Sequence, residues 1–420
     1  MFIGIDDTDS RERYCTTYIA TLLMEELSNY KLDDPRLIRF NPMVKYKTRG
    51  NGGVAIRILD KVDERDKEEI KDITLKIIEK YSDMDNDNTN PGVVFLDEEN
   101  YRNNINLLRD YYKKTLFDIL DINFAEDILK KINADYYKFK LGRGIIGALG
   151  AIAFFGDYTY ELIAYRKKEN WGKKRRIDKE SVIIMDKETF PYTYDNYDYE
   201  NDKILIAPNT PCPVLFGIRG IDKDILIKAM EMIKGEEPER FMIFKTNHGT
   251  DAHLRRMKIK DIYPNTGVIV YGKVVNNPKD IEGGHVIFKI SDGTGEISCA
   301  AYEPTKGFRE IIRKLIVGDY VAVYGTVREE PLTINLEKIK ILRLEKKYIL
   351  DKRCPFCGGT LKAKGKKVGF KCRKCKKVIK YDKIKKIEVE RDLKIGFYEV
   401  PGSARRHLSK PIQLIDLVEK

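Results

Sequence analysis

At 420 residues, 42% hydrophobic and 34% charged, the chain is long and apolar enough for about three or four globular domains. No run of 18 apolar residues occurs, which excludes a membrane-spanning segment, and the acidic, strand-like N-terminus is unlike a signal peptide. We therefore expect a cytoplasmic protein. Seven cysteines, four of them in paired spacing, favour a metal site in a reducing compartment over a disulfide framework.

The formal charge of +12 is concentrated near the C-terminus. Residues 352–386 contain fifteen Lys or Arg and one acid, so the remainder of the chain has a net charge of about −2. A localised basic module is typical of a nucleic-acid-binding surface. A lysine-rich solvated face is the alternative interpretation.

The chain opens with an apolar stretch, residues 2–5, that predicts a buried strand ending on three carboxylates, Asp6, Asp7 and Asp9. Ligands of open α/β sheets bind beyond the carboxyl ends of strands, and crowded acids repel one another unless a cation lies between them. Mg²⁺ takes one or two carboxylates together with substrate phosphates. The cluster therefore predicts a magnesium site; the alternative is an acidic turn whose aspartates bond their own backbone.

A helix is predicted over residues 16–29 from the spacing of its apolar residues. Cys15, Thr16 and Thr17 open this helix, which brings two hydroxyl groups to a helix N-terminus, where phosphate is favoured. A threonine N-cap is the alternative role.

Two strands are predicted at residues 35–40 and 54–59, and a basic glycine loop lies between them. Lys45, Lys47 and Arg49 stand beside Gly50, Gly52 and Gly53, so backbone N–H groups can surround an anion there. The loop is not a Walker A sequence, and a glycine hairpin with exposed cations explains it equally well. A helix (66–81), a polar loop (83–91) and two helical segments up to residue 133 complete the first predicted domain.

Residues 142–147 match the pattern G-x-G-x-x-G, but Glu161 lies inside the next alternating strand (158–165) instead of ending it. A helix that starts on glycines and packs against a sheet explains the pattern better than a dinucleotide site. Strands at 181–185, 204–207 and 241–246 and a helix at 225–233 predict a small α+β domain of ferredoxin-like type.

Residues 208–220 are dense in proline and glycine, which predicts a rigid pocket wall. Cys212 within it has no metal-spaced partner, so we interpret it as structural. The aromatic and acidic stretch 192–202 either lines a pocket for a cation or is a polar loop. His248 and His253 lack a third zinc ligand nearby, which favours hydrogen-bonding roles.

From residue 266 the pattern changes to short alternating strands, at 266–275, 285–291, 296–301, 320–327 and 333–342, with a helix at 308–315. Five strands with a helix before the fourth is the order of an OB-fold. Most OB-folds bind single strands or tRNA anticodon regions through stacking aromatics and a basic groove.

Cys354, Cys357, Cys372 and Cys375 form two C-x-x-C pairs separated by fourteen residues. This spacing predicts a structural, tetrahedral Zn²⁺ site, with redox pairs as the less favoured alternative. The zinc would fold the basic module. The tail that follows adds further cations for phosphate contact: Arg405, Arg406, His407 and Lys410.

Taken together, these features resemble one family over essentially the whole chain, the archaeal 2-agmatinylcytidine (agmatidine) synthetases that modify the second isoleucine tRNA. The motifs that carry the resemblance are residues 4–10 (GIDDTDS), 15–18 (CTTY), 47–52 (KTRGNG), 208–213 (PNTPCP), 217–220 (GIRG), 281–285 (IEGGH), 403–410 (SARRHLSK) and the four paired cysteines. No departure removes a motif residue.

The resemblance implies a multidomain α+β protein in four parts: a kinase-like, ATP-binding α/β domain (1–133), a ferredoxin-like domain (134–258), an OB-fold (259–345) and a zinc ribbon with a basic tail (346–420). It also implies the reaction. ATP, agmatine and the second isoleucine tRNA give agmatidine at the wobble cytidine of the CAU anticodon, with release of AMP and pyrophosphate. Agmatine's amine replaces the C2 oxygen of the base, a poor leaving group that must first be phosphorylated.

The residues expected to carry this function fall into five sets. Asp6, Asp7 and Asp9 would hold Mg²⁺ and act in catalysis, together with Thr16, the residue that looks equivalent to the family's phosphorylated threonine. ATP would contact Lys47, Arg49, Gly50 and Asn51. Agmatine's guanidinium needs a carboxylate, for which the candidates are Glu161, Asp195, Asp198 and Asp202. RNA would contact Arg373, Lys374, Arg405, Arg406, His407 and Lys410. The four cysteines would hold zinc.

Two other functions remain open from the residues alone. A non-enzymatic RNA-binding protein would use the OB-fold and the zinc ribbon, but it leaves the aspartate cluster and the basic loop unexplained. A different ATP-dependent tRNA-modifying enzyme would attach another amine to the base, and only the family resemblance favours agmatine.

Overall fold

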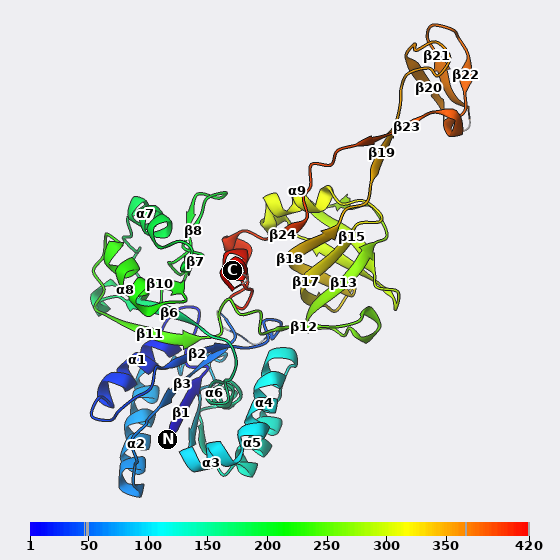
Figure 1. Cartoon of the computed structure of the whole chain (residues 1–420). Coiled ribbons are helices and arrows are strands. Elements are labelled where there is room, and N and C mark those ends of the chain that lie inside the picture. Colours follow the sequence, from blue (N-terminus) through cyan, green and yellow to red (C-terminus); the bar gives the residue numbers. More distant parts are fainter. Residues whose placement is uncertain (46, 48–49, 366–367, 419–420) are drawn as a thin grey trace.

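A computed structural model of the chain describes residues 1–45, 47, 50–365 and 368–418. Figure 1 shows the N-terminal half as one large body, the OB-fold beside it and a small C-terminal module at the far end of a narrow connection. Among the described residues, no helix combines the length and the apolar character that a membrane crossing requires.

The N-terminal half is built on one nine-stranded sheet with the order β5-β4-β1-β3-β2-β11-β6-β10-β7. Its strands are β1 (Phe2–Asp6), β2 (Arg36–Arg39), β3 (Gly52–Arg57), β4 (Gly92–Leu96), β5 (Asp135–Lys138), β6 (Thr159–Tyr165), β7 (Thr193–Tyr194), β10 (Val214–Gly220) and β11 (Arg240–Thr246). All their pairings are antiparallel except β2 with β11. The sheet around β1 is thus not the parallel, open α/β arrangement on which the aspartate argument relied. The carboxyl end of β1 lies instead beside the first residues of β3 and β4.

Both faces of β1 are buried, since alternate residues point to opposite faces of a strand. Ile3 and Ile5 join a hydrophobic cluster with α1 (Thr16–Glu26) and α2 (Glu64–Tyr81), whereas Phe2 joins one with α4 (Ile105–Phe117), α5 (Ile122–Lys131) and α6 (Ile145–Ile152). The remaining helix before residue 133 is α3 (Glu98–Asn103). The helix predicted at 66–81 is confirmed. Two helical segments were predicted after it, and the described residues contain three helices there, α3, α4 and α5.

The glycine pattern at 142–147 serves packing, as predicted. A Cβ on Gly144 would lie 2.3 Å from the carbonyl oxygen of Asp6, and one on Gly147 would lie 1.9 Å from Asp6 Oδ2. Helix α6 therefore lies directly on β1 because these positions carry no side chain. The same absence leaves room for the Asp6 carboxylate between strand and helix.

Two predicted strands of the second domain are wrong. Residues 181–185 belong to helix α7 (Lys179–Thr189), which begins where the Asp178 side chain accepts a hydrogen bond from Ser181 N. Its buried residues Val182, Met185 and Thr189 are spaced three and four apart, which is the helical period. Of residues 204–207, only Ile204 is in a strand, β9 (Lys203–Ile204), which pairs with β8 (Tyr197–Asp198). Helix α8 (Lys223–Met232) confirms the helix predicted at 225–233.

The predicted OB-fold is confirmed. Its five main strands are β13 (Gly267–Val274), β15 (His285–Ser291), β16 (Glu296–Ala301), β17 (Tyr320–Arg328) and β18 (Thr333–Arg343), with α9 (Gly307–Arg313) before the fourth. Strand β13 pairs with both β15 and β17, which closes the barrel around a core of Val, Ile and Phe side chains. Short strands β12 (Leu254–Arg256) and β14 (Lys279–Ile281) extend the sheet.

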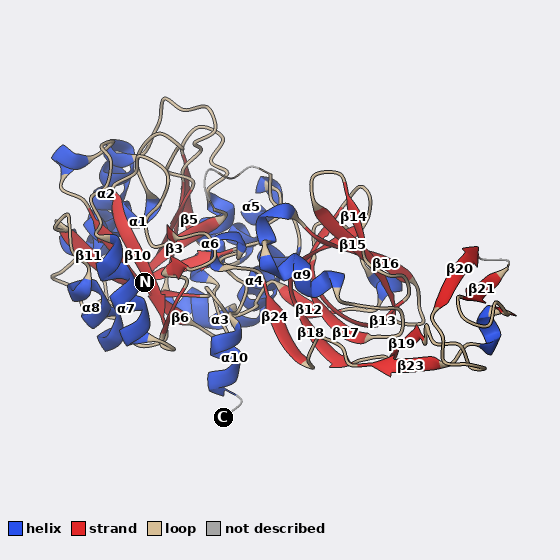
Figure 2. Ribbon diagram, turned by 90° about the horizontal axis from the view of Figure 1, so that it is seen from above, coloured by secondary structure: helices blue, strands red, loops and turns tan. Residues whose placement is uncertain are grey.

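The C-terminal part separates into a distal module and a returning tail. A ladder of β19 (Lys347–Leu350) and β23 (Lys386–Val389) leads to a three-stranded sheet of β20 (Leu361–Gly365), β21 (Gly369–Cys372) and β22 (Val378–Ile379). The chain then returns, pairs β24 (Gly396–Glu399) with β18 and ends in α10 (Ile412–Val418). Figures 1 and 2 show the module at one extremity and α10 next to the N-terminal half.

Strand β5 and helix α6 both follow residue 133, where the first domain is predicted to end. Both nevertheless contact strands of that predicted domain, since β5 pairs with β4 and α6 lies on β1 and β3. The domain boundaries, and the kinase-like and ferredoxin-like classes of the first two domains, stay predictions.

Candidate active site

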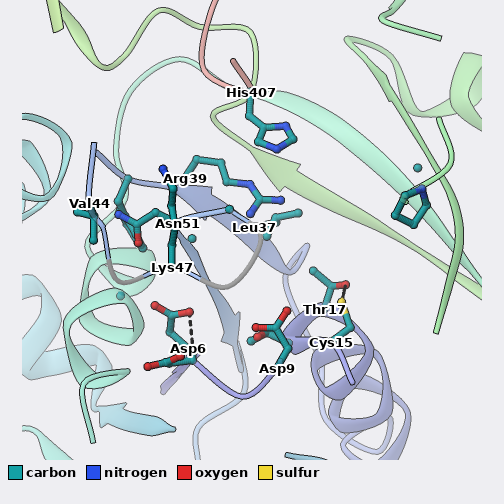
Figure 3. Close-up of a pocket in the computed structure, with 18 of the residues that line it drawn as sticks. Asp6, Asp9, Cys15, Thr17, Leu37, Arg39, Val44, Lys47, Asn51 and His407 are labelled. Atoms are coloured by element: carbon teal, nitrogen blue, oxygen red, sulfur yellow. Dashed lines mark hydrogen bonds between the residues drawn. The ribbon is translucent and has the colours of Figure 1, made fainter. Parts of the chain in front are cut away.

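A pocket of about 1,200 Å³ lies between the β1 end of the nine-stranded sheet, strands β6 and β10 of the same sheet, and the returning tail. Figure 3 shows side chains from the β1–α1 region, from the β2–β3 region and from the tail around it. The predicted site residues that line it are Asp6, Asp7, Asp9, Thr16, Lys47, Gly50, Asn51, Glu161, Asp195, Arg405 and His407. Segments hundreds of residues apart in the chain thus form one site.

The acidic side of the pocket is formed by the turn after β1. The backbone N–H of Asp7 donates to Asp6 Oδ1 at 2.7 Å, and Asp7 itself has a φ of 59°, in the left-handed region that aspartate tolerates better than most residues. Burial, followed by repulsion from Asp7, raises the pKa of Asp6 well above its ordinary value. Because an anion in that position is disfavoured unless a cation joins it, the turn fits a bound metal ion.

Asp7 already has one cationic neighbour. Arg143 Nη2 donates to Asp7 Oδ2 at 3.0 Å and also to the carbonyl oxygen of Asn88. Among the described residues, only the four paired cysteines bring three or more potential ligand atoms within 4.8 Å of one another. The three aspartates therefore line the pocket without forming a closed cage.

Helix α1 begins at this acidic turn. Its N-cap residue is Cys15, with no side-chain capping bond, so the threonine cap that the sequence suggested is not formed there. Thr16 is 8% exposed, and its Oγ1 lies 2.9 Å from Thr8 Oγ1. Figure 3 shows Cys15 and Thr17 beside Asp9 on the same side of the pocket. The first turn of α1 and the aspartates therefore share one surface.

The opposite side of the pocket is basic. Lys47 lines it and donates from Nζ to the carbonyl oxygen of Pro42, and Asn51 Nδ2 donates to Asn41 O at 3.0 Å. Arg39 on β2 extends into the same region in Figure 3. Arg49, which the sequence also predicts here, lies outside the described residues.

A buried network of charged side chains forms the floor between β6 and β10. Glu161 Oε1 accepts from Arg219 Nε at 3.3 Å, and Oε2 lies 3.2 Å from His248 Nδ1. Arg39 Nε donates to His248 Nε2 at 2.9 Å, so this ring nitrogen carries no proton. Burial lowers the pKa of His248 to about 4. For Glu161, burial raises the pKa, but the charges of its neighbours, His248 and Arg219 first, outweigh burial and bring it to about 2.

The four carboxylates considered for agmatine separate into two groups. Asp195 lines the pocket with Glu161 and pairs with Arg405, with Arg219 at 3.8 Å. Asp198 and Asp202 are not among the lining residues. Asp198 accepts from the backbone of Glu200 and Asn201, and Asp202 accepts from Lys179 and Tyr197.

The tail crosses the pocket instead of forming a free basic arm. Arg405 pairs with Asp195 and Glu399, and Arg406 lies 3.2 Å from Glu337 of the OB-fold. Lys410 is held through its backbone, whose N–H donates to Asp251 and whose carbonyl accepts from Lys338. The phosphate contacts predicted for these residues stay predictions.

His407 of the tail lines the pocket, with its ring turned into it in Figure 3. Its Nδ1 accepts from Arg219 Nη2 at 2.7 Å, and its ring stacks on His248 with 5.2 Å between centroids. Burial, with the adjoining Arg219 and Arg39, lowers the pKa of His407 well below its ordinary value. The ring is therefore neutral with its proton on Nε2, which makes it a hydrogen-bond donor.

A metal centre lies far from this pocket. Cys354 Sγ is 3.7 Å from Cys375 Sγ, and Cys357 Sγ is 3.5 Å from Cys372 Sγ. Tetrahedral Zn–S bonds of about 2.3 Å place sulfurs about 3.8 Å apart, so the four residues fit zinc. Arg373 and Lys374, predicted to contact RNA, are exposed on the second cysteine turn.

Three arginines of the pocket were not predicted as site residues. Arg39 and Arg219 occupy strands, and Arg143 stands between two glycines that were interpreted as packing residues. The sequence did offer a signal for them. Arg39 and Arg219 are cations in otherwise apolar or glycine-containing strands, and Arg143 is a cation between two glycines. Cys212 is buried, which agrees with a structural role, and His253 Nε2 lies 3.0 Å from Glu337 Oε2, in agreement with a hydrogen-bonding one.

Comparison with known proteins assigns the family. Family models match along the chain: the TiaS TCKD domain (residues 2–141), the TiaS FLD domain (142–253), an OB-fold nucleic acid binding domain (268–342) and the TiaS C-terminal zinc ribbon domain (351–393).

Several curated relatives are named as the 2-agmatinylcytidine synthetase TiaS of the second isoleucine tRNA. The protein from Methanocaldococcus jannaschii is 75% identical over all of this chain and 99% of its own length. The one from Thermococcus sibiricus is 47% identical over 99% of this chain and 96% of its own length.

Solved structures agree with this assignment. A crystal structure of TiaS in complex with the second isoleucine tRNA and ATP matches with a TM-score of 0.87 and 44% identity. One of TiaS with the same tRNA, AMPCPP and agmatine matches with a TM-score of 0.84 and 42% identity. Both matches cover 98% of this chain and 96% of the matched chain. The chain therefore belongs to the TiaS family, the 2-agmatinylcytidine synthetases of the second isoleucine tRNA.

Proposed function

We propose that this protein is an ATP-dependent tRNA-modifying ligase that conjugates agmatine to C2 of the wobble cytidine of the second isoleucine tRNA, forming agmatidine with release of AMP and pyrophosphate. The single observation that carries the proposal is the joint pocket, which the aspartate turn, Thr16, and Lys47 with Gly50 and Asn51 all line. Membership of the family supplies the substrates.

The reaction requires activation of the cytidine. The C2 oxygen is a poor leaving group, and phosphorylation by ATP turns it into a good one before the amine of agmatine attacks C2. Lys47, Gly50 and Asn51 would bind the polyphosphate, and so would Arg49, which lies outside the described residues. Asp6, Asp7 and Asp9 would hold Mg²⁺, which supplies charge neutralisation on phosphoryl oxygens when it is bound. Thr16 would act as a phosphate carrier beside them.

The amine substrate is expected on the β6–β10 side. Agmatine is a cation at both ends, and its guanidinium needs an anionic or carbonyl partner. Glu161 and Asp195 line this side, but both are already paired with Arg219, and Asp195 with Arg405 as well. We propose that agmatine contacts Asp195 or Glu161 by sharing these partners, and that Asp198 and Asp202 act only in the fold.

The distal half would deliver the RNA. The cytidine has to leave its stack to reach a pocket of this depth, and OB-folds and basic zinc ribbons bind unstacked or phosphate-rich nucleic acid. Structural zinc on the four cysteines would hold Arg373 and Lys374 in place for this contact. We propose four domains in the order kinase-like, ferredoxin-like, OB-fold and zinc ribbon, and a cytoplasmic location.

One assay tests the proposal. Purified protein is incubated with ATP, Mg²⁺, labelled agmatine and isoleucine tRNA bearing a CAU anticodon. Label in the RNA at the wobble position is the expected result. ATP turnover that depends on tRNA but transfers no agmatine would instead indicate another base-modifying enzyme, and tRNA binding without turnover would indicate an RNA-binding protein.

A further inference from the structure

Arg175 is bound by the pocket wall in an unusual way. Its guanidinium donates to four backbone carbonyls: Pro208 O at 2.9 Å, Thr210 O at 2.8 Å, Cys212 O at 3.1 Å and Val214 O at 2.9 Å. These are alternate residues of one segment. Among the described residues, no carboxylate lies within 4.0 Å of this guanidinium. In the part of the chain that the structure describes, its hydrogen bonds therefore go to the wall, to these four carbonyls and to Cys212 Sγ at 3.5 Å.

The sequence of the wall explains why it needs such a partner. Pro208, Pro211 and Pro213 have no N–H group, so this segment has few donors for its own carbonyls. Within it, Cys212 N donates to Thr210 O at 2.8 Å. Carbonyls that stay buried without a donor cost free energy, and a guanidinium offers five N–H donors in a fixed plane. One side chain thus binds four carbonyls of a seven-residue segment.

The other side of the same segment lines the pocket. Pro208, Asn209, Cys212 and Val214 are all lining residues. The segment leads directly into β10, where a Cβ on Gly217 would lie 3.0 Å from Glu161 Oε1. Arg219 and Glu161 are register partners in the β6–β10 ladder, so the wall meets this part of the site at the first residue of that ladder, Val214.

A second arginine holds Arg175 in place. Arg166, 1% exposed, forms a two-bond pair with Glu236 at 2.7 Å and donates to the carbonyls of Lys173 and Lys174. Its own backbone N–H donates to Pro213 O at 2.8 Å. The segment that carries Arg175 and the wall that it binds are thus both anchored to β6.

We propose that Arg175 is a positioning residue, which shapes the 208–214 wall of the pocket and thereby sets the affinity for the amine substrate without touching it. The inference rests on the proposed function for the identity of that substrate. The wall adjoins the Glu161 side of the pocket, whereas Lys47, Gly50 and Asn51 come from the β2–β3 connection. Loss of Arg175 should therefore change the KM for agmatine and leave the KM for ATP unchanged.

The test compares R175K and R175A with R176K, a matched control at the neighbouring exposed arginine. A lysine ammonium cannot reach four carbonyls in one plane, so we expect R175K to raise the KM for agmatine by about 10-fold and R175A by up to about 100-fold. The KM for ATP should stay within about twofold, and R176K should behave as wild type.

Two further readouts separate positioning from loss of folding. Free guanidinium, at concentrations far below those that unfold proteins, should restore R175A in part by occupying the emptied carbonyl cage, whereas potassium should not. Amide hydrogen exchange should rise at Asn209, Thr210, Cys212 and Val214 in R175K and not in R176K.

The inference is overturned if R175K melts like wild type and keeps the wild-type KM for agmatine, or if exchange in 208–214 is unchanged. If R175A does not fold, the KM for agmatine and the amide exchange of R175K test the inference instead. If the wild-type enzyme transfers no agmatine at all, the proposed function fails, and the exchange measurement still decides whether Arg175 holds the wall.

Discussion

The zinc ribbon and the central pocket are organised in opposite ways. The ribbon takes its four ligands from within 22 residues, Cys354–Cys375, and its small hydrophobic cluster includes those cysteines themselves. The pocket takes side chains from the first β-strand, the β2–β3 connection, β6, β10 and the C-terminal tail. A metal can fold the ribbon locally, whereas the pocket exists only after the sheet, the OB-fold and the tail have assembled. Each of the following predictions tests this contrast.

The largest effect is expected from loss of zinc. Structural zinc contributes an apparent binding free energy of about 10–16 kcal/mol to modules of this kind, so C372S or a strong chelator should unfold the ribbon alone. Zinc content and amide exchange over 351–393 report the loss. ATP binding at the distant pocket should persist; its loss together with the zinc would show that the two regions fold as one unit.

Asp6 gives the next largest effect. Replacement of its carboxylate by an amide in D6N should slow ATP cleavage by about 10²–10³-fold, since the charge that would hold a cation against the phosphates is lost. The same change removes a buried anion next to Asp7, so the melting temperature should rise or stay the same. D72N, at an exposed acid of α2, is the control. ATP cleavage by D6N at the wild-type rate would rule out this role.

The His248 network should give the protein a pH-dependent stability. The pKa of His248 is lowered from its ordinary value of 6.5 to about 4, so the unfolded chain binds a proton in this range that the folded chain does not. Stability is complete above about pH 6.5 and falls as the pH decreases towards 4, by on the order of 3 kcal/mol. Chemical unfolding between pH 7 and 4 measures this slope.

Several groups face His248: Glu161, Arg39, Arg219 and His407. The pKa of Glu161 is lowered to about 2, so its contribution is lost as the pH falls below about 4.5, at the acid end of this window. His407 has a lowered pKa and adds to the slope with the same sign. H248Q should therefore reduce the slope without abolishing it, and H285Q in the OB-fold should leave it unchanged. An H248Q slope equal to that of wild type would contradict the assignment.

The smallest effect is expected at Asp202, outside the pocket. Its ion pair with Lys179 is largely exposed, and such pairs contribute little to stability because water and salt screen them. D202N should leave both stability and the KM for agmatine close to wild type. D195N, which changes a pocket carboxylate bound to Arg405, should raise that KM. If D195N and D202N changed the KM for agmatine equally, lining the pocket would not be what makes a carboxylate matter for amine binding.

The sequence by itself determined several features that depend on short-range spacing. The zinc site follows from two cysteine pairs, the OB-fold from alternating strands, and the buried first strand from its apolar residues, because metal geometry and the two-residue period of a strand act within a few residues. The apolar run at 181–185 was misassigned for a related reason: over so few residues, a helix face and a strand look alike until an N-cap such as Asp178 is recognised.

Only the tertiary structure decided which charged groups meet. Glu161, Arg219, His248, Arg39 and His407 come from five separate segments, and no periodicity in the chain indicates that they share one network. The tertiary structure also decided that Glu161 and Asp195 line the pocket and form ion pairs with arginines. Asp198 and Asp202 are not among the lining residues. Such contacts depend on how strands and tail are placed in space, and that placement is set by the packing of whole layers, which no single segment encodes.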